Sequence, residues 1–186
     1  MVTGGTATGG TAAAARADET AAATPDGVLE AELLRLAGSV PDPELPVLTL
    51  AELGVLRGLQ LLGPGRVEVR LTPTYTGCPA IDTMVADITQ VLRERGMTEV
   101  SVRTVLAPAW STDAISAEGR RKLAEHGIAP PRPVGSGGPV PVALSVRCPH
   151  CGSVDTTVLS RFSSTACKSL RRCESCREPF DHFKEL

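Results

Sequence analysis

The stretch TYTGCPAID, residues 74–82, lies where one period of hydrophobic residues gives way to another. In residues 67–71, just before it, Val and Leu alternate with polar residues, which is the pattern of a half-buried strand. After it, apolar residues recur on one helical face until Gly96, a natural helix end. A strand that passes into an amphipathic helix indicates a mixed arrangement of sheet and helix, with Cys78 at the junction.

Further elements are expected on both sides of this junction. Residues 26–38 have the apolar spacing of a helix, and the prolines within 41–46 predict a rigid extended loop. The turn residues 63–65 predict that the strands flanking them pair as a hairpin. The expected elements are helices over 26–38, 50–53, 79–96 and 116–127 and strands over 55–62, 67–71 and 99–106. This order predicts a small two-layer α+β domain.

Composition divides the chain into four segments. Residues 1–24 are mostly Ala, Thr and Gly with little to bury, so we expect a disordered tail. Residues 25–128 hold the α+β domain, and the Pro- and Gly-rich residues 129–142 are expected to form a linker. Residues 143–186 form a second, smaller unit with strand-like alternation. The predicted fold class is α+β, a small two-layer α/β domain followed by a C-terminal zinc-ribbon-like β domain.

The charge balance gives no electrostatic reason to expect nucleic acid or an anionic membrane as a partner. Lys and Arg number 19 against 21 Asp and Glu, for a formal net charge of -2. The start of the chain lacks the basic and strongly apolar regions of a signal peptide, and no segment approaches the apolar length of a membrane span. We therefore expect a cytoplasmic protein.

Two Cys-x-x-Cys pairs in the C-terminal segment predict a metal site formed by Cys148, Cys151, Cys173 and Cys176. Disulfides are the weaker interpretation, because no secretion signal accompanies the cysteines. A unit this short gains little from apolar burial, whereas a structural metal contributes roughly 10–16 kcal/mol to folding. Four thiolates suit a closed tetrahedral zinc site, although a single iron or an iron–sulfur cluster uses the same ligands.

Three further residues of this segment have metal-ligating side chains. His150 and His182 could each replace a sulfur, but four thiolates complete the shell, so we expect both to be exposed and unligated. Cys167 is either a small core residue or an extra ligand.

Zinc ribbons also occur in nucleic-acid-binding proteins, so a ribbon that binds nucleic acid is a rival hypothesis. The only basic cluster of the C-terminal segment is formed by Lys168, Arg171 and Arg172. A cluster this small is better explained as an ordinary solvated face.

Cys78 has three possible roles: ligand, nucleophile or small core residue. Pro79 suits the first position of a helix, which would place Cys78 at or beside the N-cap. The helix dipole there would make the thiol ionise more easily than a free one. A cysteine nucleophile would need a histidine base, and His126 is the only histidine of the first domain. A thiol enzyme using Cys78 with His126 is therefore a further hypothesis.

Several motifs together resemble known proteins. Residues 42–46 (DPELP), 52–55 (ELGV) and 72–79 (TPTYTGCP) are similar to the small domain of SufT-type and cytosolic iron–sulfur assembly factors. The whole combination resembles the PaaD family, which belongs to the bacterial phenylacetyl-CoA epoxidase system. The additional matching motifs lie at 107–113 (APAWSTD), 118–123 (EGRRKL), 164–168 (STACK) and 178–184 (EPFDHFK).

The resemblance implies an accessory subunit in aerobic phenylacetate breakdown, which assembles or delivers an iron or iron–sulfur centre. Its expected partners are the oxygenase and reductase subunits, and the chain is not expected to be catalytic alone, since it lacks paired Glu-x-x-His helices and a dinucleotide fingerprint.

In this interpretation Cys78 is a transient metal or cluster ligand, acting alone or across a homodimer, and Asp42, Glu44 and Thr76 shape its site. The alternative is a zinc-ribbon module that binds nucleic acid or protein without a metal-delivery role.

Overall fold

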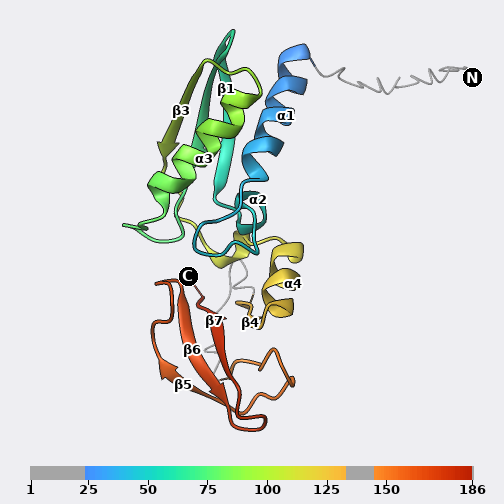
Figure 1. Cartoon of the computed structure of the whole chain (residues 1–186), viewed down its shortest axis with the longest axis vertical. Coiled ribbons are helices and arrows are strands. Elements are labelled where there is room, and N and C mark those ends of the chain that lie inside the picture. The colour runs from blue at the N-terminus through green and yellow to red at the C-terminus, as the bar shows by residue number, and fades with distance from the viewer. Residues whose placement is uncertain (1–23, 133–144, 186) are drawn as a thin grey trace, which may run out of the picture.

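The structure, a computed structural model, describes residues 24–132 and 145–185 (Figure 1). Most of the predicted tail (1–24) and linker (129–142) lies outside the described residues. The helices are α1 (Pro25–Gly38), α2 (Leu50–Leu53), α3 (Ile81–Glu94), the 3-10 turn η1 (Thr112–Ala114) and α4 (Ala117–Glu125). The strands are β1 (Leu56–Gly63), β2 (Arg66–Leu71), β3 (Glu99–Thr104), β4 (Ile128–Ala129), β5 (Thr156–Ser160), β6 (Lys168–Cys173) and β7 (Pro179–Phe183).

The first sheet has three strands in the order β1-β2-β3. β1 and β2 form the predicted antiparallel hairpin, whereas β3 pairs parallel to β2, with Val69 opposite Val102. The chain reaches β3 through α3, as a parallel connection requires. Alternation in β2 buries Val67, Val69 and Leu71 completely, as their period predicts.

Two helices cover this sheet and make the second layer. α1 packs on β1, α3 packs on β3, and the two helices contact each other. α1 begins as expected, because the Thr24 hydroxyl accepts a hydrogen bond from the backbone N–H of Gly27 and Pro25 occupies the first turn. The core between the layers includes Leu33, Ile88 and Leu92, all fully buried. The α+β prediction is confirmed for this part of the chain.

α3 begins later than predicted. Pro79 and Ala80 form a turn, with the Ile81 N–H bonded to the Cys78 carbonyl at 3.5 Å, and Ala80 is the N-cap residue. The prediction that Cys78 sits at or beside the N-cap is therefore wrong, because it lies two residues before the cap. Burial has the largest effect on the pKa of the Cys78 thiol and raises it. The turn nevertheless directs the Ala80 N–H toward the thiol, and this contact has the second-largest effect, which lowers the pKa.

The second sheet has four strands in the order β4-β7-β6-β5, and three of them come from the C-terminal segment. The fourth, β4, directly follows α4 and pairs parallel with β7, where Ile128 lies opposite Asp181. Helix α4 and β4 thus lie between the helix-covered sheet and the ribbon (Figure 1). The sheet of the ribbon is thus completed by the residue before the predicted linker and by the linker's first residue, Ala129.

Side chains from the ribbon also enter the core of the first sheet. Phe183, fully buried, and Cys167 belong to the same apolar cluster as Cys78, Met84 and Trp110. The rings of Trp110 and Phe183 lie 5.9 Å apart, and the Trp110 indole N–H donates to the Leu53 carbonyl at 3.0 Å. The two sheets are therefore joined by a shared apolar core as well as by β4.

None of the helices within residues 24–132 and 145–185 combines the length and the apolar character needed to cross a membrane.

Candidate functional site

The four cysteines of the C-terminal pairs meet at one point. The Sγ atoms of Cys148, Cys151, Cys173 and Cys176 all lie within 4.8 Å of one another. Cys148 and Cys173 are buried, whereas Cys151 is exposed and Cys176 partly so. Four thiols at this spacing fit a closed tetrahedral site, and such a site leaves no open position for a substrate.

Each pair lies on a tight turn that aims its sulfurs inward. In the first turn, the N–H of Gly152 donates to the Cys148 carbonyl at 2.9 Å, and Gly152 adopts a positive φ of 76°. The second turn repeats this arrangement, with the Arg177 N–H bonded to the Cys173 carbonyl at 3.0 Å and Arg177 at a φ of 66°. The left-handed residue after each pair closes the turn so that both sulfurs face the same point.

The electrostatics of these turns favour a thiolate at Cys173 but not at Cys151 or Cys176, whose pKa values are raised. Backbone N–H groups of Cys176 and Ser175 point at the Cys173 sulfur, and the former has the largest effect in lowering the pKa of Cys173 to about 6. The pKa of Cys176 is instead raised to about 12: the Glu178 N–H lowers it, but burial and the neighbouring sulfurs outweigh that contact. A bound divalent cation would displace the remaining protons, because metal ligation requires deprotonated thiols.

The two histidines of the ribbon do not join this group. His150 is exposed, as expected, beside Gly127. His182 is buried in β7, so the expectation of an exposed histidine is wrong there. Its Nδ1 lies 3.4 Å from the Ser169 hydroxyl and its Nε2 3.7 Å from Glu185.

The basic cluster that motivated a nucleic-acid surface is largely neutralised. Lys168 is buried rather than solvated, and its Nζ pairs with Asp181 at 2.9 Å. Arg172 pairs with Glu174 at 3.1 Å. The interpretation of this cluster as a solvated face is wrong for Lys168, and the paired cations offer little to a phosphate backbone.

A second thiol site surrounds Cys78 at the junction between the two sheets. The Cys78 side chain is only 8% exposed, and its Sγ lies 3.9 Å from Glu44 Oε2, to which it donates. Tyr75, three residues earlier in the same loop, also faces the sulfur, and this contact lowers the pKa of Cys78. The structure therefore brings Cys78 and Glu44 together, as the resemblance implied.

Asp42 holds the loop that carries Glu44. Its Oδ1 accepts hydrogen bonds from the backbone N–H groups of Glu44 at 2.9 Å and Leu45 at 2.7 Å, and the side chain is 3% exposed. This is the local turn that an Asp stabilises. Burial raises the pKa of Asp42, against the lowering effect of the two N–H groups. Thr76 lies exposed in the turn before Cys78, and its role stays a prediction.

The pKa of Cys78 moves in the direction opposite to that predicted. Burial raises it, the Ala80 N–H lowers it, and the charges of Glu44 and Asp42 raise it further, so the net shift is upward. The expectation that the helix dipole makes this thiol ionise easily is wrong, because desolvation and two nearby carboxyl groups outweigh the dipole.

The histidine required by the thiol-enzyme hypothesis lies elsewhere. His126 ends α4, and its Nδ1 lies 2.8 Å from the Lys122 carbonyl oxygen. It lines a shallow depression together with His150 and Pro179 on the ribbon. A thiol of raised pKa that faces a carboxylate rather than an imidazole is a poor nucleophile.

Comparison with known proteins identifies both halves of the chain. Residues 30–104 match the family described as "Iron-sulfur cluster assembly protein", and residues 136–184 match the "PaaD zinc beta ribbon domain". A curated protein of Escherichia coli (strain K12), named as a component of a "Putative 1,2-phenylacetyl-CoA epoxidase", is 46% identical over 82% of this chain and 91% of its own length. This chain belongs to the PaaD family.

Other relatives of this PaaD family member cover about half of the chain. An "Fe-S protein maturation auxiliary factor" of Porphyromonas gingivalis is 30% identical over 50% of the chain and 90% of its own length. A crystal structure of a DUF59 domain from Bacillus anthracis is 26% identical, with a TM-score of 0.49, and covers 53% of this chain and 93% of that one.

Sequence reasoning missed two residues that contribute to the Cys78 site of this PaaD protein. Tyr75 lies within the stretch 74–82, but a single tyrosine in a loop carries no pattern. Lys168 resembled a surface cation, but its charge acts on Glu44: burial and Asp42 raise the pKa of that carboxyl, and Lys168 only partly opposes the rise. The available signal was its position directly after Cys167, inside residues 164–168, which carry part of the resemblance to the PaaD family.

Proposed function

We propose that this protein is a cytoplasmic accessory subunit of a phenylacetyl-CoA epoxidase, which assembles or delivers an iron or iron–sulfur centre for the oxygenase or reductase subunits. The observation that carries the proposal is the pair of contrasting thiol sites. The ribbon gathers four sulfurs into a closed group, whereas Cys78 lies beside Glu44 at the junction of the two sheets, outside that group.

Closed and open sites suit different tasks. A four-thiolate shell holds its metal permanently and stabilises the fold. A site with one thiolate and one carboxylate leaves coordination positions for a donor or an acceptor protein, so a centre bound there can leave. The name of the Escherichia coli relative supports a place in the epoxidase system, and the name of the Porphyromonas gingivalis relative supports a part in Fe–S maturation.

The test is co-expression of the chain with the oxygenase and reductase subunits of a phenylacetyl-CoA epoxidase. We expect Cys78→Ser to lower the iron content and the epoxidase activity of the partner subunits severalfold, because the exchangeable ligand is lost. A matched control is Asp82→Asn, which changes an exposed residue near the same junction and should leave both quantities unchanged. Normal iron loading and full activity with Cys78→Ser would remove the role proposed for this thiol.

The rival hypothesis of a nucleic-acid-binding ribbon is tested in the same preparation. A salt-dependent mobility shift of labelled DNA or RNA at physiological salt would favour it. We expect no shift, since Lys168 and Arg172 are paired with carboxylates.

A further inference from the structure

The ribbon contributes its own cysteine to the junction where Cys78 lies. Cys167 is in the turn before β6, is 3% exposed, and belongs to the apolar cluster that contains Cys78. Its carbonyl accepts the Lys184 N–H at 3.0 Å, which ties the turn to the end of β7. In Figure 1 the start of β6 and the end of β7 both point toward the helix-covered sheet. The fold thus places one thiol from each domain in the same buried cluster.

The same charged groups act on both thiols. Burial is the largest influence in raising the pKa of Cys78 and of Cys167, and the charges of Glu44 and Asp42 raise both further. Burial also raises the pKa of Tyr75, and the charges of Glu44 and of both cysteines add to the rise. Lys168, whose side chain is only 7% exposed, adds a positive charge beside Cys167 and Glu44. Asp42 and Lys168 are buried and Glu44 is partly buried, so Cys167 lies in a charged environment rather than in a purely apolar core.

Cys167 is not needed by the ribbon metal. The four ribbon sulfurs complete a tetrahedral shell, and Cys167 is not a member of that group. Its Sγ instead lies 3.1 Å from the Thr165 hydroxyl, within its own turn. The Cys167 thiol is therefore not committed to the ribbon metal.

We propose that Cys167 is a second thiolate ligand of the iron or iron–sulfur centre bound at Cys78, with Glu44 as a carboxylate donor, so that the two domains hold the centre jointly. This inference rests on the proposed function. Soft thiolates are the ligands that iron–sulfur centres use, and the carboxylate suits an iron ion.

The junction is looser than the ribbon site. Among the residues that the structure describes, the ribbon cysteines are the only group of three or more ligating side chains whose donor atoms all lie within 4.8 Å of one another. The junction donors must therefore move closer to one another around a metal. Such a site binds more weakly than a preformed shell, as a delivery site requires.

The experiment titrates the full chain, with its ribbon filled by zinc, with Co²⁺ under anaerobic conditions. Thiolate-to-cobalt charge-transfer absorption reports the number of sulfur ligands. We expect Cys78→Ser and Cys167→Ser each to lose about half of the signal per bound cobalt and to weaken the Kd by about tenfold or more, since even losing a ligand's supporting contact costs about 10–100-fold. The double variant supplies the baseline for any cobalt that enters the ribbon.

Phe183→Leu is the matched control, because it alters packing at the junction without removing a donor. Should Cys167 be merely structural, Phe183→Leu and Cys167→Ser would have similar effects on binding. Cobalt-edge X-ray absorption of the zinc-loaded wild-type chain gives a second measurement that needs no variant. We expect two sulfur neighbours per cobalt, and one would overturn the proposal.

The outcomes also separate this inference from the proposed function. If Cys167→Ser keeps the wild-type signal and Kd while Cys78→Ser loses both, the second ligand is refuted and the role of Cys78 stands. If neither variant changes cobalt binding, both proposals fail.

Discussion

At the scale of single residues, the raised pKa of Cys78 determines what this thiol can do. Burial, Glu44 and Asp42 favour its neutral form, so in the metal-free chain the sulfur carries its proton at neutral pH. A bound cation reverses that balance, because the two carboxyl groups that oppose a free thiolate attract a metal instead. We therefore expect Cys78 to react slowly with electrophiles but to lose its proton when a metal binds, as an exchangeable ligand requires.

Two glycines of positive φ allow the cost of backbone strain to be measured separately from the cost of a steric clash. Gly54, at φ 74°, ends α2, and a Cβ there would sit on the Ala114 carbonyl and 2.8 Å from Ala114 Cβ. Gly77, at φ 86°, has open space around the same position. We expect Gly77→Ala to lower the free energy of unfolding by about 1 kcal/mol, from backbone strain alone. Gly54→Ala should cost about 3 kcal/mol or more, because overpacking adds to the strain.

Denaturant unfolding of the zinc-loaded chain, followed by far-ultraviolet circular dichroism, measures this difference. Equal losses for the two variants would show that η1 moves away from α2 at little cost, contrary to the tight contact between Gly54 and Ala114.

His182 gives a pH prediction. Burial lowers the pKa of His182, and the Glu185 carboxylate only partly opposes this effect. The folded chain therefore favours the neutral ring, so its contribution to stability is complete above the ordinary pKa of about 6.5 and is lost as the pH falls below it. We expect the free energy of unfolding to fall more steeply from pH 7 to pH 5 in the wild type than in His182→Leu. Parallel pH profiles would contradict a buried neutral histidine.

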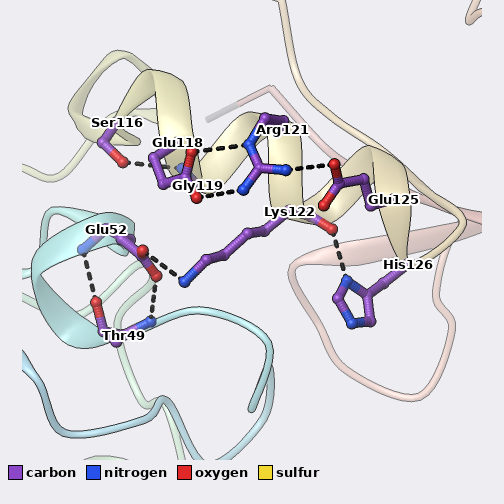
Figure 2. A network of polar contacts seen from close by, with 9 residues as sticks. All are labelled: Thr49, Glu52, Ser116, Glu118, Gly119, Arg121, Lys122, Glu125 and His126. Carbon is purple, nitrogen blue, oxygen red and sulfur yellow. Dashed lines mark hydrogen bonds and ion pairs between the residues drawn. The ribbon is translucent and has the colours of Figure 1, made fainter.

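At the scale of elements, α2 and α4 are joined by a polar network that centres on Glu52 (Figure 2). Glu52 accepts the Thr49 N–H at 2.9 Å and donates its own N–H to the Thr49 hydroxyl at 3.2 Å, which is a capping box. Its other oxygen pairs with Lys122 of α4 at 2.7 Å. One carboxylate thus starts a four-residue helix and attaches it to α4, which leads into the ribbon sheet.

This double role predicts unequal effects of removing either partner. Glu52→Ala loses the cap and the ion pair, and we expect it to lower the free energy of unfolding by about 1–2 kcal/mol. Lys122→Ala loses only a partly exposed ion pair, which is worth about 0–1 kcal/mol. Unfolding of both variants and of the double variant checks this, and the double variant should be no less stable than Glu52→Ala. A larger loss for Lys122→Ala would contradict the assignment of the cap as the main contribution.

The elements with clear periodicity could be predicted from the sequence, and the long-range contacts could not. The β1–β2 hairpin follows from alternation and turn residues, and the four-cysteine group follows from its spacing, because both signals are local. The start of α3 was misplaced because a Pro in a turn and a Pro in the first helical turn look alike. Pairing of β4 with β7 and the placement of Cys78 and Cys167 in one buried cluster arise from packing between distant segments, which no local pattern records.

At the scale of the whole molecule, the ribbon is part of the structure around Cys78 rather than a separate attachment. β4 joins the ribbon sheet to α4, and Phe183 and Cys167 complete the core that contains Trp110. The metal that folds the ribbon therefore supports the junction from a distance. Loss of the four-cysteine site should therefore loosen the Cys78 site, even when every residue of the Cys78 site is unchanged.

This coupling is tested by removing the ribbon metal in two ways, with Cys148→Ser and with a chelator. We expect zinc to fall from about one per chain toward zero, because the closed shell needs four ligands. The fluorescence of Trp110, the single tryptophan, should shift toward that of a solvated indole as Phe183 withdraws. Cobalt binding at Cys78 should weaken in the same samples.

Cys78→Ser is the reciprocal control, since it removes a donor at the junction and should leave both the zinc content and the Trp110 fluorescence unchanged. Zinc loss without any change at Trp110 would mean that the first domain holds the junction alone, and the ribbon metal would then have no part in forming the Cys78 site.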